Sequence, residues 1–163
     1  MRTPGLRGLT LTILLGAAES LPAQSFTFRP FMQAELRAEV SVAHRAAAIA
    51  MAGANVPLGY YVRAGFAAGL GVADMPDGAA LSTRADAALR FLLDPFADHA
   101  WGPYAGGGLT VRRDGDARAR AGVLFIVGVE GRRSGRWTPA VEAALGEGAR
   151  LAVVLRRSRA NGR

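Results

Sequence analysis

The stretch ARARAGVLFIVGVEG, residues 117–131, decides the fold because its side chains alternate in chemistry with a period of two. Every odd-numbered position in it is apolar, from Ala117 through Phe125 to Val129. The even-numbered positions carry Arg118 and Arg120 at one end and Glu130 at the other. Since successive residues of a strand point to opposite faces, the stretch predicts a β-strand with one apolar face. It is much longer than the roughly five or six residues of an ordinary globular strand.

Seven other segments predict strands, and short polar turns separate most of them. Period-two alternation is clear in most of these segments, whereas residues 46–56 are apolar on both faces and would also suit a helix. Turn-forming residues such as Pro76, Asp77 and Gly78 stand between the segments. We therefore predict an all-β domain of eight antiparallel strands in up-and-down order. The seven segments are residues 32–43, 46–56, 59–72, 81–94, 104–113, 137–146 and 149–157.

The composition excludes several other classes of protein. Half of the 163 residues are hydrophobic, yet no apolar run approaches the roughly 20 residues that a membrane-spanning helix needs. There is no cysteine, which excludes disulfides and thiolate metal sites. The net charge of +7 comes from arginines scattered along alternating segments rather than gathered on one helix or stripe, so we expect no nucleic-acid partner.

The first residues have the order of a secretory signal. Two arginines and no acid occupy residues 1–8, an apolar block follows over residues 9–18, and Ala23 precedes Gln24. This order predicts a signal peptide over residues 1–23, cleaved after Ala23, and a mature domain over residues 24–163 outside the cytoplasm. A buried first helix is the alternative, and it does not account for this order.

The charged faces fit a polar barrel interior, although a soluble sandwich would show the same charges on its solvent face. An eight-stranded barrel fills its interior with side chains, and in membrane barrels that interior is polar. The long strands also suffice to cross a bilayer, which takes about 9–11 residues. We predict that the inward side chains form ion pairs. The arginines assigned to the inner face are Arg37, Arg63, Arg84, Arg90, Arg112, Arg118, Arg120, Arg136, Arg150 and Arg156, and the acids are Glu35, Glu39, Asp86, Glu130 and Glu142.

Aromatic residues stand at or just before the start of every second segment along the chain, beginning with the first. In an up-and-down barrel all of these starts lie at one rim, where amphipathic rings favour a membrane interface. We therefore predict an aromatic girdle at the periplasmic rim. Its members are Phe31, Tyr60, Tyr61, Trp101, Tyr104 and Trp137.

The stretch WGPYAGGGLTV, residues 101–111, resembles a strand that recurs in small outer-membrane β-barrels. Over residues 24–157 the chain is similar to the eight-stranded OmpA and OmpX type of architecture. The resemblance implies an outer-membrane protein, monomeric and without a cofactor, that has a structural or surface-interaction role and no catalytic activity. The alternative is a secreted or periplasmic soluble β-barrel that binds a small apolar ligand, in which the apolar faces would point inward.

Candidate chemical groups are few. The two histidines, His44 and His99, fall in connections at opposite rims, so neither a catalytic triad nor a metal site is expected. Four arginines flank the turn at Asp114 and Gly115, which this topology puts at the outer surface. Arginine suits bidentate contacts with phosphate, so these residues predict a site for lipopolysaccharide; a solvated hairpin tip is the alternative. The four are Arg112, Arg113, Arg118 and Arg120.

Overall fold

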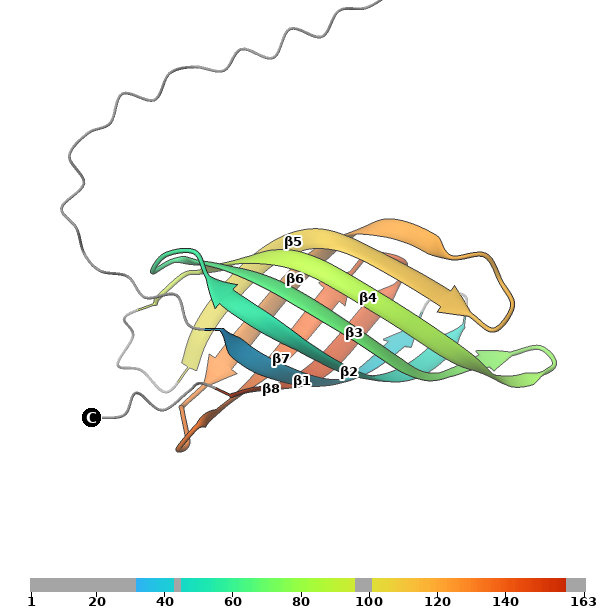
Figure 1. Cartoon of the computed structure of the whole chain (residues 1–163), viewed down its shortest axis with the longest axis horizontal. Coiled ribbons are helices and arrows are strands. Elements are labelled where there is room, and N and C mark those ends of the chain that lie inside the picture. Colours follow the sequence, from blue (N-terminus) through green and yellow to red (C-terminus); the bar gives the residue numbers. More distant parts are fainter. Residues whose placement is uncertain (1–31, 43–44, 96–100, 158–163) are drawn as a thin grey trace, which may run out of the picture.

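Eight antiparallel strands close into one barrel in the computed structural model, which describes residues 32–42, 45–95 and 101–157 (Figure 1). Each strand pairs with the next along the chain, and β8 pairs with β1. The predicted architecture is thus confirmed. Within the described part of the chain, no helix is long and apolar enough to cross a membrane. The strands are β1 (Gln33–Val42), β2 (Ala46–Pro57), β3 (Val62–Met75), β4 (Gly78–Leu92), β5 (Trp101–Asp114), β6 (Arg120–Gly131), β7 (Trp137–Leu145) and β8 (Ala149–Arg157).

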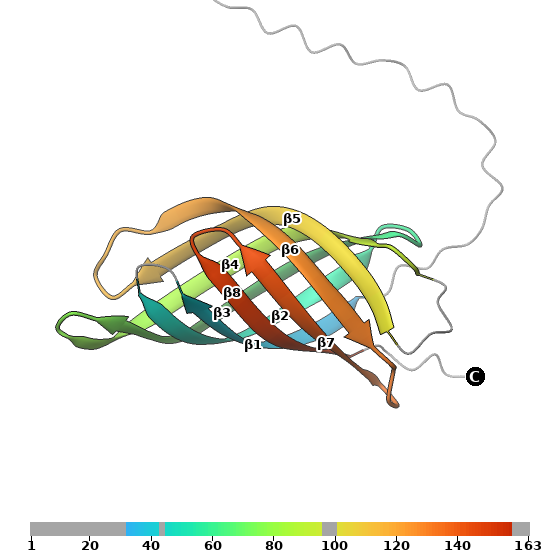
Figure 2. The ribbon, with the colours of Figure 1, turned by 180° about the vertical axis from the view of Figure 1, so that it is seen from behind.

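The two ends of the barrel differ in what they carry. One end, called here the hairpin end, holds the turns β1–β2, β3–β4, β5–β6 and β7–β8 (Figures 1 and 2). The other, the terminal end, is where β1 begins and β8 finishes. The β3–β4 and β5–β6 turns at the hairpin end use glycine with a positive φ, 117° at Gly78 and 53° at Gly115, which side chains rarely tolerate.

The apolar faces of the strands point outward. Phe125 and Leu109 have 64% and 65% of their surface exposed, whereas the alternating charged side chains are buried inside. On β4 the outward apolar face runs from Leu81 to Phe91. Ten residue steps of about 3.4 Å, tilted by about 45°, give a height of roughly 24 Å, close to the apolar band of membrane barrels. A soluble cup for an apolar ligand needs the opposite arrangement of faces.

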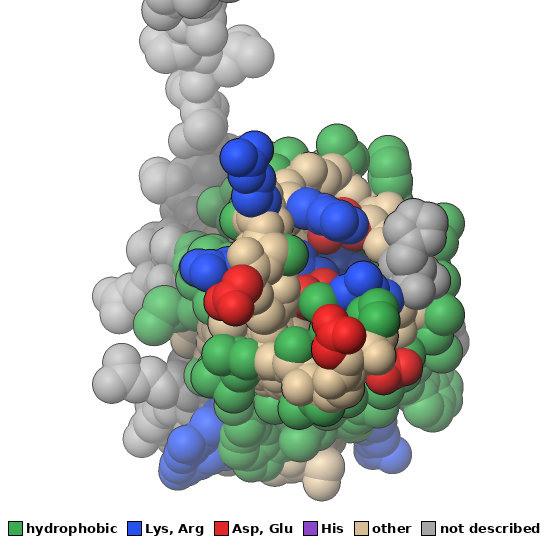
Figure 3. All heavy atoms as spheres, turned by 90° about the vertical axis from the view of Figure 1, so that its right-hand side faces the viewer, with side chains coloured by type: hydrophobic (Ala, Val, Ile, Leu, Met, Phe, Trp, Pro, Cys, Tyr) green, Lys and Arg blue, Asp and Glu red, His purple; other side chains and the backbone are tan. Residues whose placement is uncertain are grey.

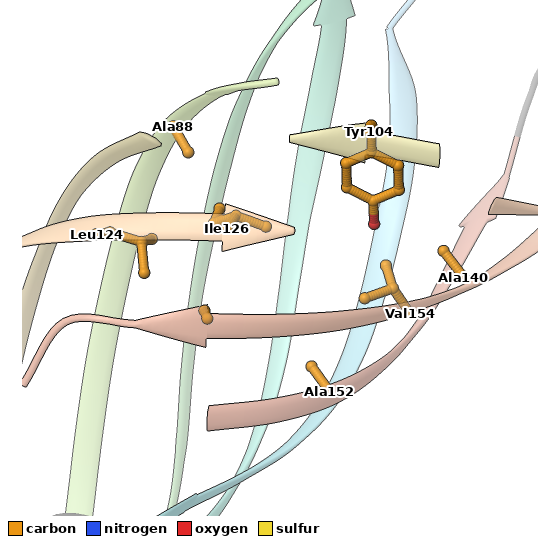
Figure 4. Packing of buried hydrophobic residues seen from close by; sticks show 8 residues of the cluster. Ala88, Tyr104, Leu124, Ile126, Ala140, Ala152 and Val154 are labelled. Atoms are coloured by element: carbon orange, nitrogen blue, oxygen red, sulfur yellow. The ribbon is translucent and has the colours of Figure 1, made fainter. Parts of the chain in front are cut away.

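Strand β2 settles an orientation that its sequence left open. Ile49 and Met51 point inward and are buried, while the outward positions are alanines from Ala46 to Ala54, followed by Val56. The large side chains pack inside against Ala47, Ala67 and Ala73. A second apolar cluster lies across the interior (Figure 4) and consists of Ala88, Tyr104, Leu124, Ile126, Ala140, Ala144, Ala152 and Val154.

Several strand boundaries differ from those predicted. The first residues of the 117–131 stretch belong to a turn, because the amide of Ala117 donates to the carbonyl of Asp114, and β6 begins at Arg120. Likewise, Tyr60 and Tyr61 lie in a turn closed by the amide of Leu58 and the carbonyl of Val62. Alternation continues through both turns, which is why the sequence alone extended the strands. The predicted signal peptide, Phe31, His44 and His99 lie outside the described residues.

Candidate functional site

Glu142 on β7 lies at the centre of an ion cluster in the terminal half of the barrel. Its side chain has no exposed surface. Its Oε2 is 2.5 Å from Nη2 of Arg37, and its Oε1 accepts from Nε of Arg90 at 3.1 Å and from Nη2 of Arg156 at 2.6 Å. The hydroxyl of Tyr104 also donates to Oε1, at 2.7 Å. One carboxylate therefore neutralises charge contributed by three strands.

Arg156 on β8 joins Glu142 to the two other acids of this cluster. Its Nε donates to Glu35 at 3.0 Å and its Nη1 donates to Glu130 at 2.5 Å. Glu130 also pairs with Arg63, and Glu35 also accepts from Asn55. A charge in such an interior must find partners or remain at high cost. The terminal ion cluster therefore meets this requirement with Glu35, Arg37, Arg63, Arg90, Glu130, Glu142 and Arg156.

Tyr104 belongs to this interior and not to the aromatic girdle, so its assignment to the girdle was wrong. Its side chain is buried, with the guanidinium of Arg156 5.1 Å from the ring centroid. Gly128 stands directly opposite it on β6, and a Cβ there would come within 2.4 Å of the ring. Because Tyr104 is inward by strand parity, alternation from Trp101 would have indicated this placement.

The other girdle residues described by the structure do gather at the terminal end. Tyr60, Tyr61, Trp101 and Trp137 are all exposed there. The guanidinium of Arg157 lies 5.8 Å from the ring of Trp137. Whether these rings meet a membrane interface stays a prediction.

A second ion cluster fills the hairpin half. Arg84 pairs with Glu39, and Nη1 of Arg150 lies 3.1 Å from Oδ2 of Asp86. Arg112 donates to Asp114 at 2.8 Å and to the hydroxyl of Ser41 at 3.3 Å. The hairpin ion cluster comprises Glu39, Arg84, Asp86, Arg112, Asp114 and Arg150.

Above this cluster, the barrel opens at the hairpin end into a cavity of about 380 Å³, called here the mouth. Figure 3 looks onto this end and shows basic and acidic side chains around a hollow. Three strands and three turns supply its walls, and its charged residues are four arginines and two acids. The lining residues are Arg45, Met75, Arg112, Asp114, Ala117, Arg118, Arg120 and Glu147.

Asp114 stands at the rim of the mouth, where two neighbouring side chains donate to it. Its oxygen Oδ1 accepts from Arg112 at 2.8 Å and from Ser82 at 2.6 Å. This negative charge is therefore already committed to a neighbouring arginine.

The structure divides the four arginines predicted to contact lipopolysaccharide. Arg112 is buried and paired, Arg118 and Arg120 line the mouth, and Arg113 alone points outward on β5. The inner-face assignments of Arg118 and Arg136 were wrong, because both residues lie in turns and are exposed. Arg120 has the inward parity of β6 and lines the mouth, although its side chain is exposed. The other predicted interior arginines and acids do form ion pairs.

Sequence reasoning missed three lining residues of the mouth. Arg45, Met75 and Glu147 come from the β1–β2 turn, the end of β3 and the β7–β8 turn, which are distant in sequence. Only the closed strand order brings these turns to one rim. Among residues 32–42, 45–95 and 101–157, no group of three or more His, Cys, Asp or Glu side chains could hold a metal ion.

No protein-family model matches the sequence, and no curated protein matches it either. Solved structures do match its fold. Neisserial surface protein A (NspA) aligns with a TM-score of 0.57 at 13% identity, covering 78% of this chain and 96% of that one. The N-terminal β-barrel domain of Pseudomonas aeruginosa OprF aligns with a TM-score of 0.50 at 14% identity, covering 78% and 99%. The chain thus shares the fold of small eight-stranded outer-membrane barrels.

Proposed function

We propose that this chain is a monomeric outer-membrane β-barrel that crosses the bilayer and has a closed interior. Its role is structural or in surface interactions, without catalysis. The observation that carries the proposal is the outward apolar band, which spans roughly 24 Å and encloses an ion-paired interior. In water such an apolar band would promote aggregation, whereas in a bilayer it contacts the apolar lipid chains. The similarity to NspA and to the OprF barrel domain supports the same reading.

The packed interior argues against a general porin. Side chains of both ion clusters that stand at mid-barrel, such as Arg37, Arg84 and Glu142, are almost completely buried. Apolar residues on β2 and β6 fill the space beside them. We therefore expect no open channel for solutes, and the role falls to the surfaces of the barrel.

The proposed orientation puts the terminal end in the periplasm and the hairpin end outside the cell. The exposed rings at the terminal end would then lie at the inner interface. Arg113, which points outward at the opposite end, would lie among headgroups and contact lipopolysaccharide phosphates.

Fractionation and surface labelling of cells test location and orientation together. The chain, expressed with residues 1–23 in a Gram-negative host, should appear in the outer-membrane fraction and resist alkaline extraction. A peptide tag inserted between Pro76 and Asp77 should be accessible on intact cells, and one beside Ser134 should not. Recovery in the soluble periplasm would contradict the location, and the reverse labelling pattern would contradict the orientation.

The lipid contact of Arg113 has a separate test. Arg113→Gln should reduce the lipopolysaccharide that co-purifies with the barrel, whereas Arg132→Gln, an exposed arginine at the terminal end, should not. Equal co-purification for both variants and the unaltered chain would exclude the contact.

A further inference from the structure

Positive charge in the mouth is not compensated by the acids there. Asp114 is committed to Arg112 and Ser82, and the side chain of Glu147 packs over Gly122, 3.2 Å from where a Cβ would stand. Glu147 also interacts electrostatically with Arg84 and Arg150 below it. Within the described residues, neither Arg118 nor Arg120 makes an ion pair or a side-chain hydrogen bond. Two guanidinium groups therefore face the cavity with their donors available.

Unpaired donors also lie beneath the mouth. Arg84 and Arg150 are almost completely buried, yet Nε of Arg84 and both Nε and Nη2 of Arg150 have no hydrogen-bond partner in the described structure. Buried polar groups are nearly always satisfied, because an unsatisfied donor costs about 1–3 kcal/mol. These orphaned donors are a second observation, independent of the lining of the cavity, that arginines around the mouth lack acceptors.

Arg112 connects these deep donors to the cavity. It lines the mouth and stands opposite Arg84 in the β4–β5 register. Its Nη1 also donates to Ser41, which stands opposite Arg150 in the β1–β8 register. The deep arginines therefore lie directly behind the floor of the mouth. Arg45, whose guanidinium contacts the sulfur of Met75, completes the rim from the β1–β2 turn.

This arrangement favours a phosphate group over a carboxylate. Each guanidinium fork matches two oxygens of one anion, and a phosphate has enough oxygens for two such bidentate contacts, whereas a carboxylate has one pair. The volume of about 380 Å³ also leaves room for part of the molecule that carries the phosphate. Met75 and Ala117 give that part an apolar contact.

The geometry points to a phosphate-binding site in the mouth, in which Arg45, Arg118 and Arg120 hold the anion at the rim and Arg112 completes the site from below. It goes beyond the proposed function, since it lies inside the opening and not on the lipid-facing wall. The phosphate can belong to a soluble ester or to a sugar phosphate of lipopolysaccharide, and the chemistry of recognition is the same for both.

Calorimetric titration tests the site with inorganic phosphate as the probe. The barrel, refolded in detergent free of lipopolysaccharide, should bind phosphate saturably at low ionic strength and more weakly as NaCl is added. Arg118→Gln/Arg120→Gln should raise the Kd about tenfold or more, because two charge-assisted contacts are lost. The matched control Arg132→Gln/Arg136→Gln removes the same charge from exposed turn positions at the terminal end and should leave the Kd unchanged.

Two results would overturn the site: no saturable binding by the unaltered barrel, or equal weakening in the rim variant and in the control. The heat-dependent electrophoretic mobility of the same samples reports folding separately. A barrel that shifts on heating but does not bind phosphate refutes the mouth site alone, whereas a chain that never shifts refutes the membrane barrel. Competition by lipopolysaccharide but not by its dephosphorylated form would support the site and identify a lipid source; phosphate binding without that competition would support it with a soluble one.

Discussion

Replacing Glu142 with glutamine removes one negative charge from the middle of the terminal ion cluster while keeping the shape of the side chain. Arg37, Arg90 and Arg156 then share only the remaining acids, and Nη2 of Arg156 loses a carboxylate that was 2.6 Å away. Breaking a buried ion pair by neutralising one partner costs about 3–5 kcal/mol, because the other charge stays buried. We expect a loss of that size in the free energy of unfolding, which is roughly two to three and a half powers of ten in the equilibrium constant.

The assay is urea unfolding of the barrel in lipid vesicles, followed by tryptophan fluorescence and by electrophoretic mobility. With a slope of about 3 kcal/mol per molar urea, the midpoint should fall by at least about 1 M. The control is Glu147→Gln at the half-buried mouth, which should change stability by no more than about 0.5 kcal/mol. If Glu142→Gln stays within the same limit as the control, the interior charges do not hold the barrel together in the way argued here.

Three further predictions concern the interior, the outer wall and the terminal rim. Gly128→Val should destabilise the barrel by about 1–3 kcal/mol, because the new side chain meets the ring of Tyr104. Gly59→Ala, where a Cβ meets open space, should be neutral in the same unfolding assay. Equal effects of the two substitutions would refute the packing of Tyr104 against Gly128. Leu109→Arg should lower the free energy of unfolding in vesicles by about 2–4 kcal/mol, since it puts a charge on the lipid face. Ala79→Arg, near the β3–β4 turn, should lower it by about 0–1 kcal/mol. Unchanged stability of Leu109→Arg would place this wall outside the bilayer core. The only tryptophans, Trp101 and Trp137, should be quenched more by lipids brominated near the headgroup than by lipids brominated at the chain ends, and the opposite order would contradict an interfacial ring.

Strand parity accounts for most of what the sequence could predict. Alternation placed Phe125 outside and Arg84 inside, and the structure agrees because a pleated strand leaves no other choice once one face is known. The same alternation, counted from the outward Trp101, puts Tyr104 inside. The girdle prediction put it outside because it considered only that Tyr104 is aromatic and stands near the start of a strand. Parity loses its meaning in turns, and that is why Arg118 and Arg136 were assigned to an inner face that they do not share.

The mouth could not be predicted in the same way. Four of its eight lining residues lie in turns that alternation does not describe, and Arg45 and Glu147 meet there only because β8 closes on β1. The partners inside the barrel were equally out of reach. Parity indicated that Arg156 and Glu142 both point inward, but the stagger between strands decides that Arg156 reaches three different acids.

The most direct test of the central claim, that the apolar face meets lipid and the ion-paired face fills the interior, is the mobility of the refolded mature chain in SDS before and after heating. The unheated and heated samples should migrate differently, and β-type circular dichroism should develop in detergent or lipid but not in plain buffer. A chain that folds in plain buffer and migrates identically before and after heating would contradict it, because its apolar faces would then have to lie inside.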